Sequence, residues 1–350
     1  MNFGFDEDQQ ALRAAAEKLL AAHAGVARAG LDDAGAWKPL WTSIVELGWT
    51  SLAVPEALGG LGLGAVDLVA LAEVTGRWVL PAPFLSSAGL AGPVLAATGA
   101  HPESLAAIAE GRVTTLAVGD VTWDGDVLRG RAPLVPDAAR AETLVVVAGP
   151  VVAVVAADAD GVAIHATHAA DPNRPLADVH LDGVRPLGAV EADAEPGLDA
   201  ARTVLAAELV GVADRILELS VEHARSRAQF GQPIGAFQAV KHRLADLYVA
   251  VERARTLTYA AAMALDDPGT TVGRRVEAAS LAKAAASETA LAAFRTGVQV
   301  HGAIAITWEH DLHLFGRRAR QGALALGDHL VHYQRAAESF LDDAFLGEAG

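Results

Sequence analysis

RSRAQFGQPIGAFQAVKH, residues 225–242, is the segment that decides the fold of this 350-residue chain. At its centre, Gly231-Gln232-Pro233 interrupts helical periodicity, because glycine and proline favour turns over helix. Apolar residues recur at helical spacing on both sides: Leu205, Leu209, Val212, Ile216 and Leu219 before it, and Phe237, Val240, Leu244, Leu247 and Val251 after it. The segment therefore predicts a turn between two long helices, each with one apolar seam.

Two further helices are predicted after this pair. Asp267-Pro268-Gly269 ends the second helix, and the stretch from Gly302 to Asp311 interrupts a third before a last helix resumes at about Leu312. Helical periodicity returns after Leu198 and lasts to about Phe345. We expect residues 193–350 to form a C-terminal four-helix bundle with antiparallel neighbours.

The segment upstream of the bundle has a different pattern. Residues 113–192 are rich in valine and threonine, and their apolar runs are too short for helices. Asp124-Gly125 and Gly149-Pro150 each separate two runs of strand length, which indicates hairpins. We predict a small antiparallel β domain over residues 113–192.

Residues 1–112 return to helical spacing and predict an N-terminal helical domain. Its apolar repeats begin at Leu12, and further runs extend from Trp37 to Leu47 and from Val66 to Arg77. Between these runs, residues 60–65 fit the Gly-x-Gly-x-x-Ala pattern of dinucleotide sites. No alternating series of strands and helices follows, so a glycine-rich turn between helices is the preferred interpretation.

Composition excludes several classes of function. The formal charge is −16, from 27 basic and 43 acidic residues, and no basic stripe interrupts it, which argues against nucleic acid as a partner. The absence of cysteine excludes disulfides, thiolate metal sites and cysteine nucleophiles. The acidic start MNFGFDEDQQ does not resemble a secretory signal, and a cytoplasmic protein is expected. The uncharged stretch from Trp78 to His101 contains three prolines and three glycines, so buried helices and loops are predicted there and membrane insertion is not.

The motifs, taken with this order of parts, resemble the acyl-CoA dehydrogenase family over nearly the whole length. Residues 225–242 are similar to that family's Arg-x-x-Phe-Gly … Phe-Gln segment between bundle helices. Further similar segments are Leu47-Gly48-Trp49, Val54-Pro55-Glu56, Gly59-Gly60-Leu61-Gly62, Gln299-Val300-His301-Gly302 and Arg317-Arg318-Ala319. The resemblance implies FAD-dependent desaturation of an acyl-CoA between its α and β carbons, with electrons leaving to an electron-transfer flavoprotein.

The resemblance also implies roles for individual residues. Arg227 would bind the FAD pyrophosphate, an anion that favours a planar cation; the alternative is a solvated cation at a helix end. The cofactor-binding residues implied in this way are Arg227, Phe230, Gln238, Gln299 and Gly302. Arg202 would help to orient the thioester of the substrate, and its alternative is a surface ion pair.

Three departures from the family pattern concern the flavin and the base. Where the family has Gln-x-x-Gly-Gly-x-Gly, this chain has Ala303 and Ala305 in place of two glycines. Residues 117–120 and 134–137 replace two segments that usually supply hydroxyl groups to the flavin. Counting from one motif places the family's catalytic glutamate at Leu326, and counting from another places it at Asp328. The candidate bases are therefore Asp328 and, on an earlier helix, Glu208.

Chains with these departures resemble the smaller partner of heteromeric acyl-CoA dehydrogenases, known from bacterial steroid side-chain degradation, in which unlike subunits share FAD sites. We expect a homo- or hetero-oligomer with another subunit of this family. The alternative is a non-catalytic subunit for acyl-CoA binding or assembly. His310-x-x-His313 has ligand types that suit a metal site. No histidine here follows a glutamate by three residues as in bundle di-metal centres, so no metal is predicted.

Overall fold

The computed structural model describes residues 5–346. Its helices are α1 (Glu7–Ala22), α2 (Val26–Ala29), α3 (Lys38–Glu46), α4 (Ala65–Arg77), α5 (Gly92–Thr98), α6 (Pro102–Ala109), α7 (Glu195–Ser226), α8 (Gln238–Asp266), α9 (Val272–His301), α10 (Leu312–Leu324) and α11 (His329–Leu346). Its strands are β1 (Thr114–Val118), β2 (Asp120–Trp123), β3 (Leu128–Pro136), β4 (Thr143–Ala148), β5 (Val151–Ala156), β6 (Val162–Thr167), β7 (Leu176–Val184), β8 (Gly188–Glu191), β9 (Ala228–Gln229) and β10 (Gln232–Pro233).

These elements form two compact units. The described residues up to Arg28, with Val69–Leu80 and those from Leu205 onward, form one that we call the bundle unit. Ala29–Leu68 and Pro81–Val204 form the other, which we call the β unit. The change from helices to strands falls between α6 and β1, and the change back falls between β8 and α7. Both lie close to the predicted domain boundaries, although the boundaries of 1–112, 113–192 and 193–350 themselves stay a prediction.

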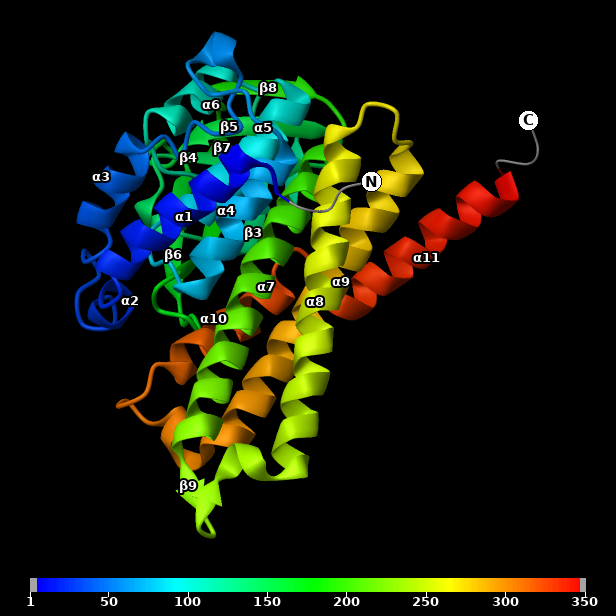
Figure 1. The fold of residues 1–350 in the computed structure, drawn as a ribbon. Helices are drawn as coiled ribbons and strands as arrows, with labels where there is room; N and C mark the ends of the chain where they lie inside the picture. The colour runs from blue at the N-terminus through cyan, green and yellow to red at the C-terminus, as the bar shows by residue number, and fades with distance from the viewer. Residues whose placement is uncertain (1–4, 347–350) are drawn as a thin grey trace. The chain divides into compact units, whose positions relative to one another are not determined.

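The segment at residues 225–242 folds as its sequence predicts. Helix α7 ends at Ser226, the short strands β9 and β10 pair as an antiparallel hairpin, and α8 begins at Gln238. Phe230 and Gly231 form the turn with φ angles of 54° and 82°, a backbone region that suits glycine and strains phenylalanine. Figure 1 shows this hairpin at the free end of α7 and α8, labelled β9.

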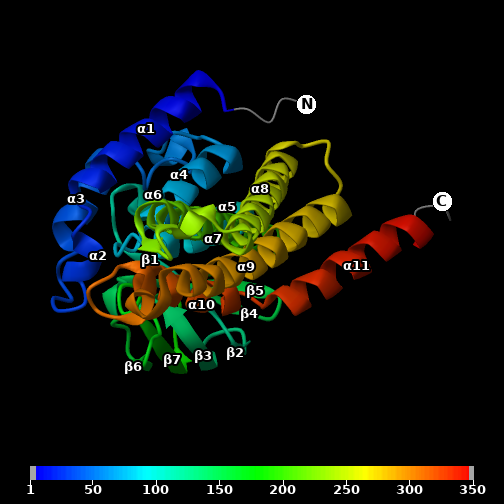
Figure 2. The same ribbon diagram turned by 60° about the horizontal axis from the view of Figure 1, so that its bottom comes forward.

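The remaining bundle helices follow α8. Helix α9 packs against both α8 and α11, as Figure 2 shows. The last predicted helix is in the structure two helices, α10 and α11. The chain breaks between them because Leu326 and Gly327 take left-handed φ angles of 54° and 101°, which cannot continue a right-handed helix.

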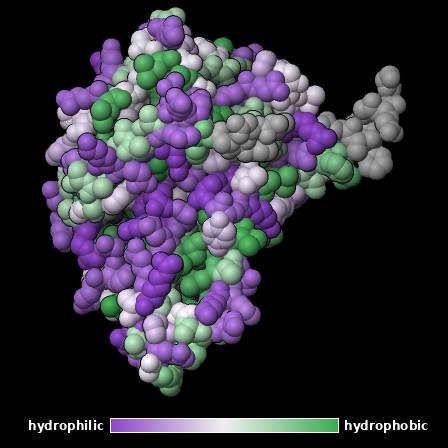
Figure 3. All heavy atoms as spheres, in the orientation of Figure 1, coloured by the Kyte–Doolittle hydropathy of each residue, from purple (hydrophilic) through white to green (hydrophobic). Residues whose placement is uncertain are grey.

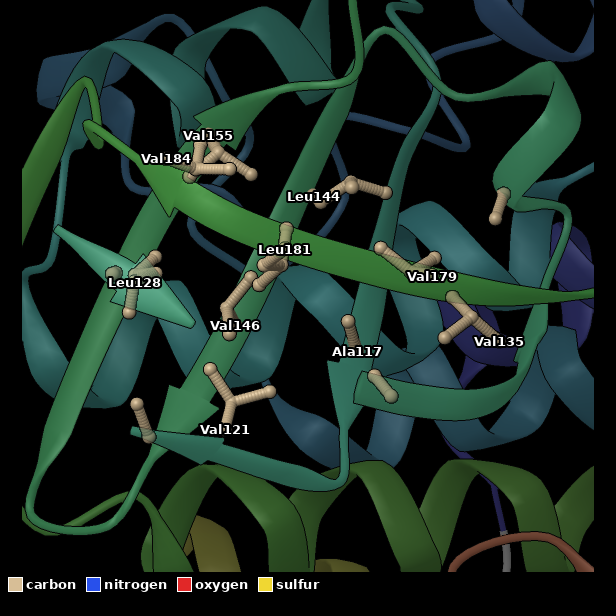
Figure 4. Packing of buried hydrophobic residues seen from close by; sticks show 14 of the residues in the cluster. Ala117, Val121, Leu128, Val135, Leu144, Val146, Val155, Val179, Leu181 and Val184 are labelled. Atoms are coloured by element: carbon tan, nitrogen blue, oxygen red, sulfur yellow. The ribbon is translucent and has the colours of Figure 1, made fainter. Parts of the chain in front are cut away.

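The β unit places its core between two four-stranded sheets, ordered β1-β4-β5-β8 and β2-β3-β7-β6. Figure 4 shows valine and leucine side chains of the two sheets meeting in this core, among them Val146, Leu181 and Val121. The hairpins predicted at Asp124-Gly125 and Gly149-Pro150 are confirmed by the antiparallel pairs β2–β3 and β4–β5. The prediction of antiparallel pairing does not hold for β1 and β4, which pair in parallel.

Two other predictions concern the N-terminal part of the chain. The stretch from Pro81 to Gly92 is buried and includes a π-helix at Leu85–Ala91, as expected of packed helices. Among the described residues, no helix is long and apolar enough to cross a membrane. Residues 60–64 form an irregular turn before α4, with no strand before it, which confirms the turn interpretation over a dinucleotide site.

Glycines let α4 and α7 approach closely in the bundle unit. A Cβ atom on Gly76 would lie 2.0 Å from the carbonyl oxygen of Glu208, and one on Gly211 would lie 1.9 Å from that of Glu73. Real Cβ atoms do not approach other atoms this closely. The crossing therefore requires glycine at both positions, and it fixes Glu208 against α4.

Gly211→Ala is expected to destabilise the protein by about 1–3 kcal/mol, because the added methyl group must push α4 away from α7. Alanine by itself stabilises a helix by about 1 kcal/mol relative to glycine. Any measured loss of stability therefore means that the collision costs more than this gain. Gly25→Ala is the matched control, since a Cβ there would meet nothing within 4 Å. Urea unfolding followed by circular dichroism measures both variants, and equal midpoints would show that the crossing tolerates a methyl group.

Candidate functional site

Arg227 lies one residue beyond α7 with a fixed backbone and an exposed side chain. Its N–H donates to the carbonyl of His223 over 2.8 Å, and its own carbonyl accepts from the N–H of Ile234 over 2.8 Å. Within the described residues, no carboxylate forms an ion pair with its guanidinium. The hairpin thus presents a positioned cation that no acidic neighbour neutralises, which suits an anionic ligand.

The other predicted cofactor residues of this segment are also exposed. Phe230 is 91% exposed, and its ring meets that of Phe237 edge to face with centroids 6.1 Å apart. Gln238, also exposed, is the first residue of α8. The ring of Phe230 is therefore free to contact another molecule.

A contact between two histidines connects the second predicted cofactor segment, Gln299 to Gly302, with the end of α7. Gln299 is exposed near the end of α9, and Gly302 follows that helix with φ 71° and open space where a Cβ would be. Between them, His301 stacks on His223, with ring centroids 4.4 Å apart and planes at 28°. His223 lies one turn before Arg227, so the structure joins the end of α9 to the start of the hairpin.

Basic side chains gather around this joint. Arg225 is exposed in the last turn of α7, and Lys241 and Arg243 are exposed on the first turns of α8. Figure 3 shows hydrophilic and hydrophobic residues mixed at this end of the bundle unit, at the bottom of the view. In a chain with a formal charge of −16, a local excess of cations attracts small anions to this end.

Asp328, the first candidate base, caps a helix. Its Oδ1 accepts the backbone N–H groups of Leu330 (2.9 Å) and Val331 (3.0 Å) at the start of α11. These bonds, that of Val331 foremost, lower the pKa of Asp328 below its usual value. A carboxylate held in this way is a weaker proton acceptor, so its contacts favour a structural role; its role as a base stays a prediction.

Asp328→Ala is expected to lower the midpoint of urea unfolding at neutral pH, because α11 loses its cap. The lowered pKa sets the sign of the pH dependence: the carboxylate stabilises the fold above about pH 4 and ceases to do so as acid protonates it. The difference between wild type and Asp328→Ala should therefore shrink on acidification. Asp328→Asn keeps a capping oxygen and should remain near wild type, whereas a midpoint as low as that of alanine would refute the cap.

Glu208, the second candidate base, lies in a buried ion pair of the bundle unit. Its Oε1 accepts from Arg318 over 2.9 Å, and these two side chains are 1% and 0% exposed. Arg318 also donates to the carbonyl of Leu80 over 3.0 Å. These contacts favour a structural role for Glu208 over that of a base, which stays a prediction.

Arg202, the predicted substrate residue, is held by two acidic neighbours in the β unit. Its guanidinium donates to Glu195 and to Asp199, each over 2.8 Å, and its side chain is 12% exposed. Burial opposes its charge, but the two carboxylates raise the pKa of Arg202 above its usual value. The ion-pair alternative thus describes the contacts of Arg202, and its role toward a thioester stays a prediction.

The β unit shows what replaces the hydroxyl groups missing from the family pattern. Asp137 is 2% exposed, takes a left-handed φ of 53°, and accepts hydrogen bonds from the buried Ser86 and from Arg140. Leu134, also left-handed, is 58% exposed. The carboxylate of Asp137 is thus hydrogen-bonded inside the β unit, and the exposed side chain of this segment, that of Leu134, is apolar.

Two groups of functional interest were not predicted from the sequence. His223 was not singled out, because its contact with His301 joins helices far apart in the chain. Lys283, fully buried on α9, donates to the carbonyls of Ala323 and Gly327 and so fixes the break between α10 and α11. Its isolation in an apolar helix was the only available signal. In the described part of the chain, no three histidine, aspartate or glutamate side chains are placed to hold a metal ion.

Comparisons with known proteins agree with this architecture. Residues 6–102 match the N-terminal domain of acyl-CoA dehydrogenases, and residues 192–341 match their C-terminal domain. The acyl-CoA dehydrogenase IpdE2 of Mycobacterium tuberculosis is 36% identical, over 91% of this chain and 93% of that protein.

Two solved structures are also similar along almost the whole chain. A Tcur3481-Tcur3483 steroid acyl-CoA dehydrogenase variant superposes with a TM-score of 0.89 at 30% identity, covering 97% of this chain and 99% of that one. The ChsE4-ChsE5 complex of Mycobacterium tuberculosis gives 0.87 at 28% identity, covering 98% and 99%. With its helices, sheets and hairpin in this order, the chain belongs to the acyl-CoA dehydrogenase family, the FAD-dependent oxidoreductases that act on a CH–CH bond of an acyl-CoA.

Proposed function

We propose that this chain is one subunit of a hetero-oligomeric acyl-CoA dehydrogenase and that it binds the pyrophosphate end of an FAD whose flavin ring and catalytic glutamate belong largely to a full-length partner. The observation that carries the proposal is the joint between the hairpin and the end of α9. The stacking of His223 on His301 connects the helix end that precedes Arg227 and Phe230 with the segment from Gln299 to Gly302, which supports the proposal. An anionic, aromatic cofactor fits the exposed cation and the exposed ring.

The residues present fit one end of FAD and not the other. At the pyrophosphate end, the chain offers an exposed guanidinium, an exposed ring, and a glycine whose missing side chain leaves the backbone accessible. At the flavin end, residues 117–120 and 134–137 carry no hydroxyl group, and the carboxylate of Asp137 is bonded within the β unit. The fit is thus partial, as expected of a site completed by a second subunit.

The division of labour follows from these contacts. Bound FAD would accept a hydride from the β carbon of the acyl-CoA. Arg227 would hold the pyrophosphate, and Phe230 would cover the cofactor from water. Proton abstraction at the α carbon would fall to the partner, because both candidate bases of this chain are engaged, Asp328 with α11 and Glu208 with Arg318.

Printed names of relatives support the substrate class and the assembly. One similar structure is named as a Tcur3481-Tcur3483 steroid acyl-CoA dehydrogenase, and another as the ChsE4-ChsE5 complex. We infer a CoA thioester of a steroid or related lipid as the substrate, an electron-transfer flavoprotein as the electron acceptor, and the cytoplasm as the compartment.

Expression of the chain alone and with candidate full-length partners tests the proposal. The chain alone should be colourless and inactive, whereas the co-purified complex should show the visible spectrum of oxidised flavin and reduce a dye with an acyl-CoA. If the lone chain carries stoichiometric FAD and turns over an acyl-CoA, the proposal fails. Turnover that survives Asp328→Asn in the complex supports a base in the partner, and its loss would assign the base to Asp328.

Because the carboxylates of Asp328 and Glu208 are both bonded within the chain, a second candidate is also favoured, a non-catalytic subunit for acyl-CoA binding or assembly. The two candidates differ in what the hairpin does. A purely assembling subunit would leave the FAD content of the complex unchanged when Arg227 is replaced, and the proposed one would not.

A further inference from the structure

Three histidine rings form a continuous contact at the end of the bundle unit. His223 of α7 stacks on His301 of α9, and His301 meets His310 edge to face with centroids 4.7 Å apart. His310 precedes α10. The contact therefore ties together three segments that no strand or disulfide connects, and we call it the histidine joint. His301, the central ring, is 7% exposed, and the rings of His223 and His310 on either side of it are partly exposed.

Hydrogen bonds orient two of these rings. The N–H of Leu312 donates to Nδ1 of His310 over 3.0 Å. Nδ1 of His301 lies 2.9 Å from the carbonyl of Gly297 and donates to it. A second proton on either ring would place a cation against its neighbours.

The charged groups around the joint oppose protonation. Arg227 of the hairpin carries positive charge close to His223, and His313 of α10 is a further titratable ring close to His310. Asp311 is occupied by Arg28, and Glu309 is exposed. No described carboxylate forms an ion pair with a ring of the joint. Burial first, then the ring of His310 and Arg227, lower the pKa of His223. Burial and the two neighbouring rings also lower the pKa of His301, although its hydrogen bonds to the carbonyls of Gly297 and Leu219 act in the opposite direction.

We propose that the histidine joint positions the two FAD-binding segments only while its rings are neutral, so that mild acid opens the joint and releases the cofactor. The inference rests on the proposed function, in that it assigns these segments to FAD. His223, His301 and His310 are positioning residues and do not touch the reacting atoms. Protons bind more readily to the separated rings than to the stacked ones, so acidification favours the open form and neutral pH favours the closed form.

The cofactor test compares FAD affinity near pH 7.5 and near pH 5.5, using the full chain with its flavin-retaining partner and free FAD as the probe. Because opening of the joint frees histidines that bind protons more readily, FAD binding is expected to weaken by about tenfold from the higher to the lower pH. His223→Phe keeps an aromatic ring that cannot be charged. The FAD affinity of this variant should differ by less than about twofold between the two pH values. His223→Lys places a fixed charge in the joint, and weak binding at both pH values is expected.

His168→Phe is the matched control, because it removes an exposed histidine of the β unit. This variant should lose FAD affinity in acid to the same extent as the wild type. A wild type whose FAD affinity does not depend on pH overturns the inference. So does a His223→Phe variant that still loses FAD in acid.

A second measurement needs no cofactor. The full chain is labelled at the histidine Cε1 atoms for NMR. Stacked rings shift one another's signals, and substitution of His223 or His301 assigns the signal of each. These shifts should collapse together on acidification. If they collapse but FAD binds at no pH, the joint is upheld and the proposed function fails; if they persist to the onset of unfolding, the joint is not acid-sensitive.

Discussion

Replacement of Arg227 by glutamine is expected to weaken FAD binding to the subunit complex on the order of 100-fold. A bidentate pair of charge-assisted hydrogen bonds contributes about 3 kcal/mol, and glutamine offers the pyrophosphate no charge. The side chain is exposed and unpaired among the described residues, so its removal leaves no buried group unsatisfied. The loss should therefore appear in cofactor affinity and not in the stability of the fold.

Flavin fluorescence titration and the ratio of FAD to protein after gel filtration measure this effect. Arg225→Gln is the matched control: it removes an equally exposed arginine two residues earlier, and it should weaken binding only through the local field, by less than about threefold at physiological salt. Arg227→Lys retains the charge without the planar fork and should fall between the two. Equal FAD affinities for the two glutamine variants would show that Arg227 makes no specific contact with the cofactor.

Arg318→Ala is expected to destabilise the protein by about 3–5 kcal/mol. Both members of the Arg318–Glu208 pair are fully buried, so truncation of the arginine leaves a carboxylate without its counter-charge and a carbonyl, that of Leu80, without its donor. The close crossing of α4 and α7 prevents Glu208 from moving toward water. Urea unfolding followed by circular dichroism measures the loss.

Two variants separate the ion pair from the bulk of its side chains. Arg320→Ala removes an exposed arginine of the same helix and should change stability by less than about 0.5 kcal/mol. Glu208→Leu with Arg318→Met replaces both charges by apolar groups of similar volume and should recover most of the lost stability. A double variant as unstable as Arg318→Ala would mean that shape, and not charge, makes this site intolerant. If the double variant folds and its complex retains turnover, Glu208 is excluded as the base.

The predictions for Arg227→Gln and Arg318→Ala assign different roles to two arginines that look equivalent in the sequence. Arg227 and Arg318 both lie in segments that resemble family motifs, and both are flanked by other basic residues. Exposure decides between them. The exposed guanidinium is available to a ligand, whereas the buried one is committed to Glu208 and the backbone.

The sequence by itself determined the order of parts and the identity of the hairpin. Those features depend on spacing within one segment: the apolar seams on either side of Gly231, the hairpin signals of the β unit, and the motif at residues 225–242. Local backbone preferences and periodicity are properties of consecutive residues, so they can be read without coordinates. The break after α10 was missed, because left-handed φ at Leu326 contradicts the preference of leucine and persists only through contacts such as that of Lys283.

Only the tertiary structure decided which neighbours each candidate residue contacts. Asp328, Glu208 and Arg202 are polar residues of plausible type, but their partners were not legible: one caps a helix, one joins a buried pair, and one binds two carboxylates. The contact of His223 with His301 likewise spans distant parts of the chain. Whether a charged group meets a ligand or a neighbour depends on which helices pack together, and that is set by the whole core and not by the spacing of any one segment.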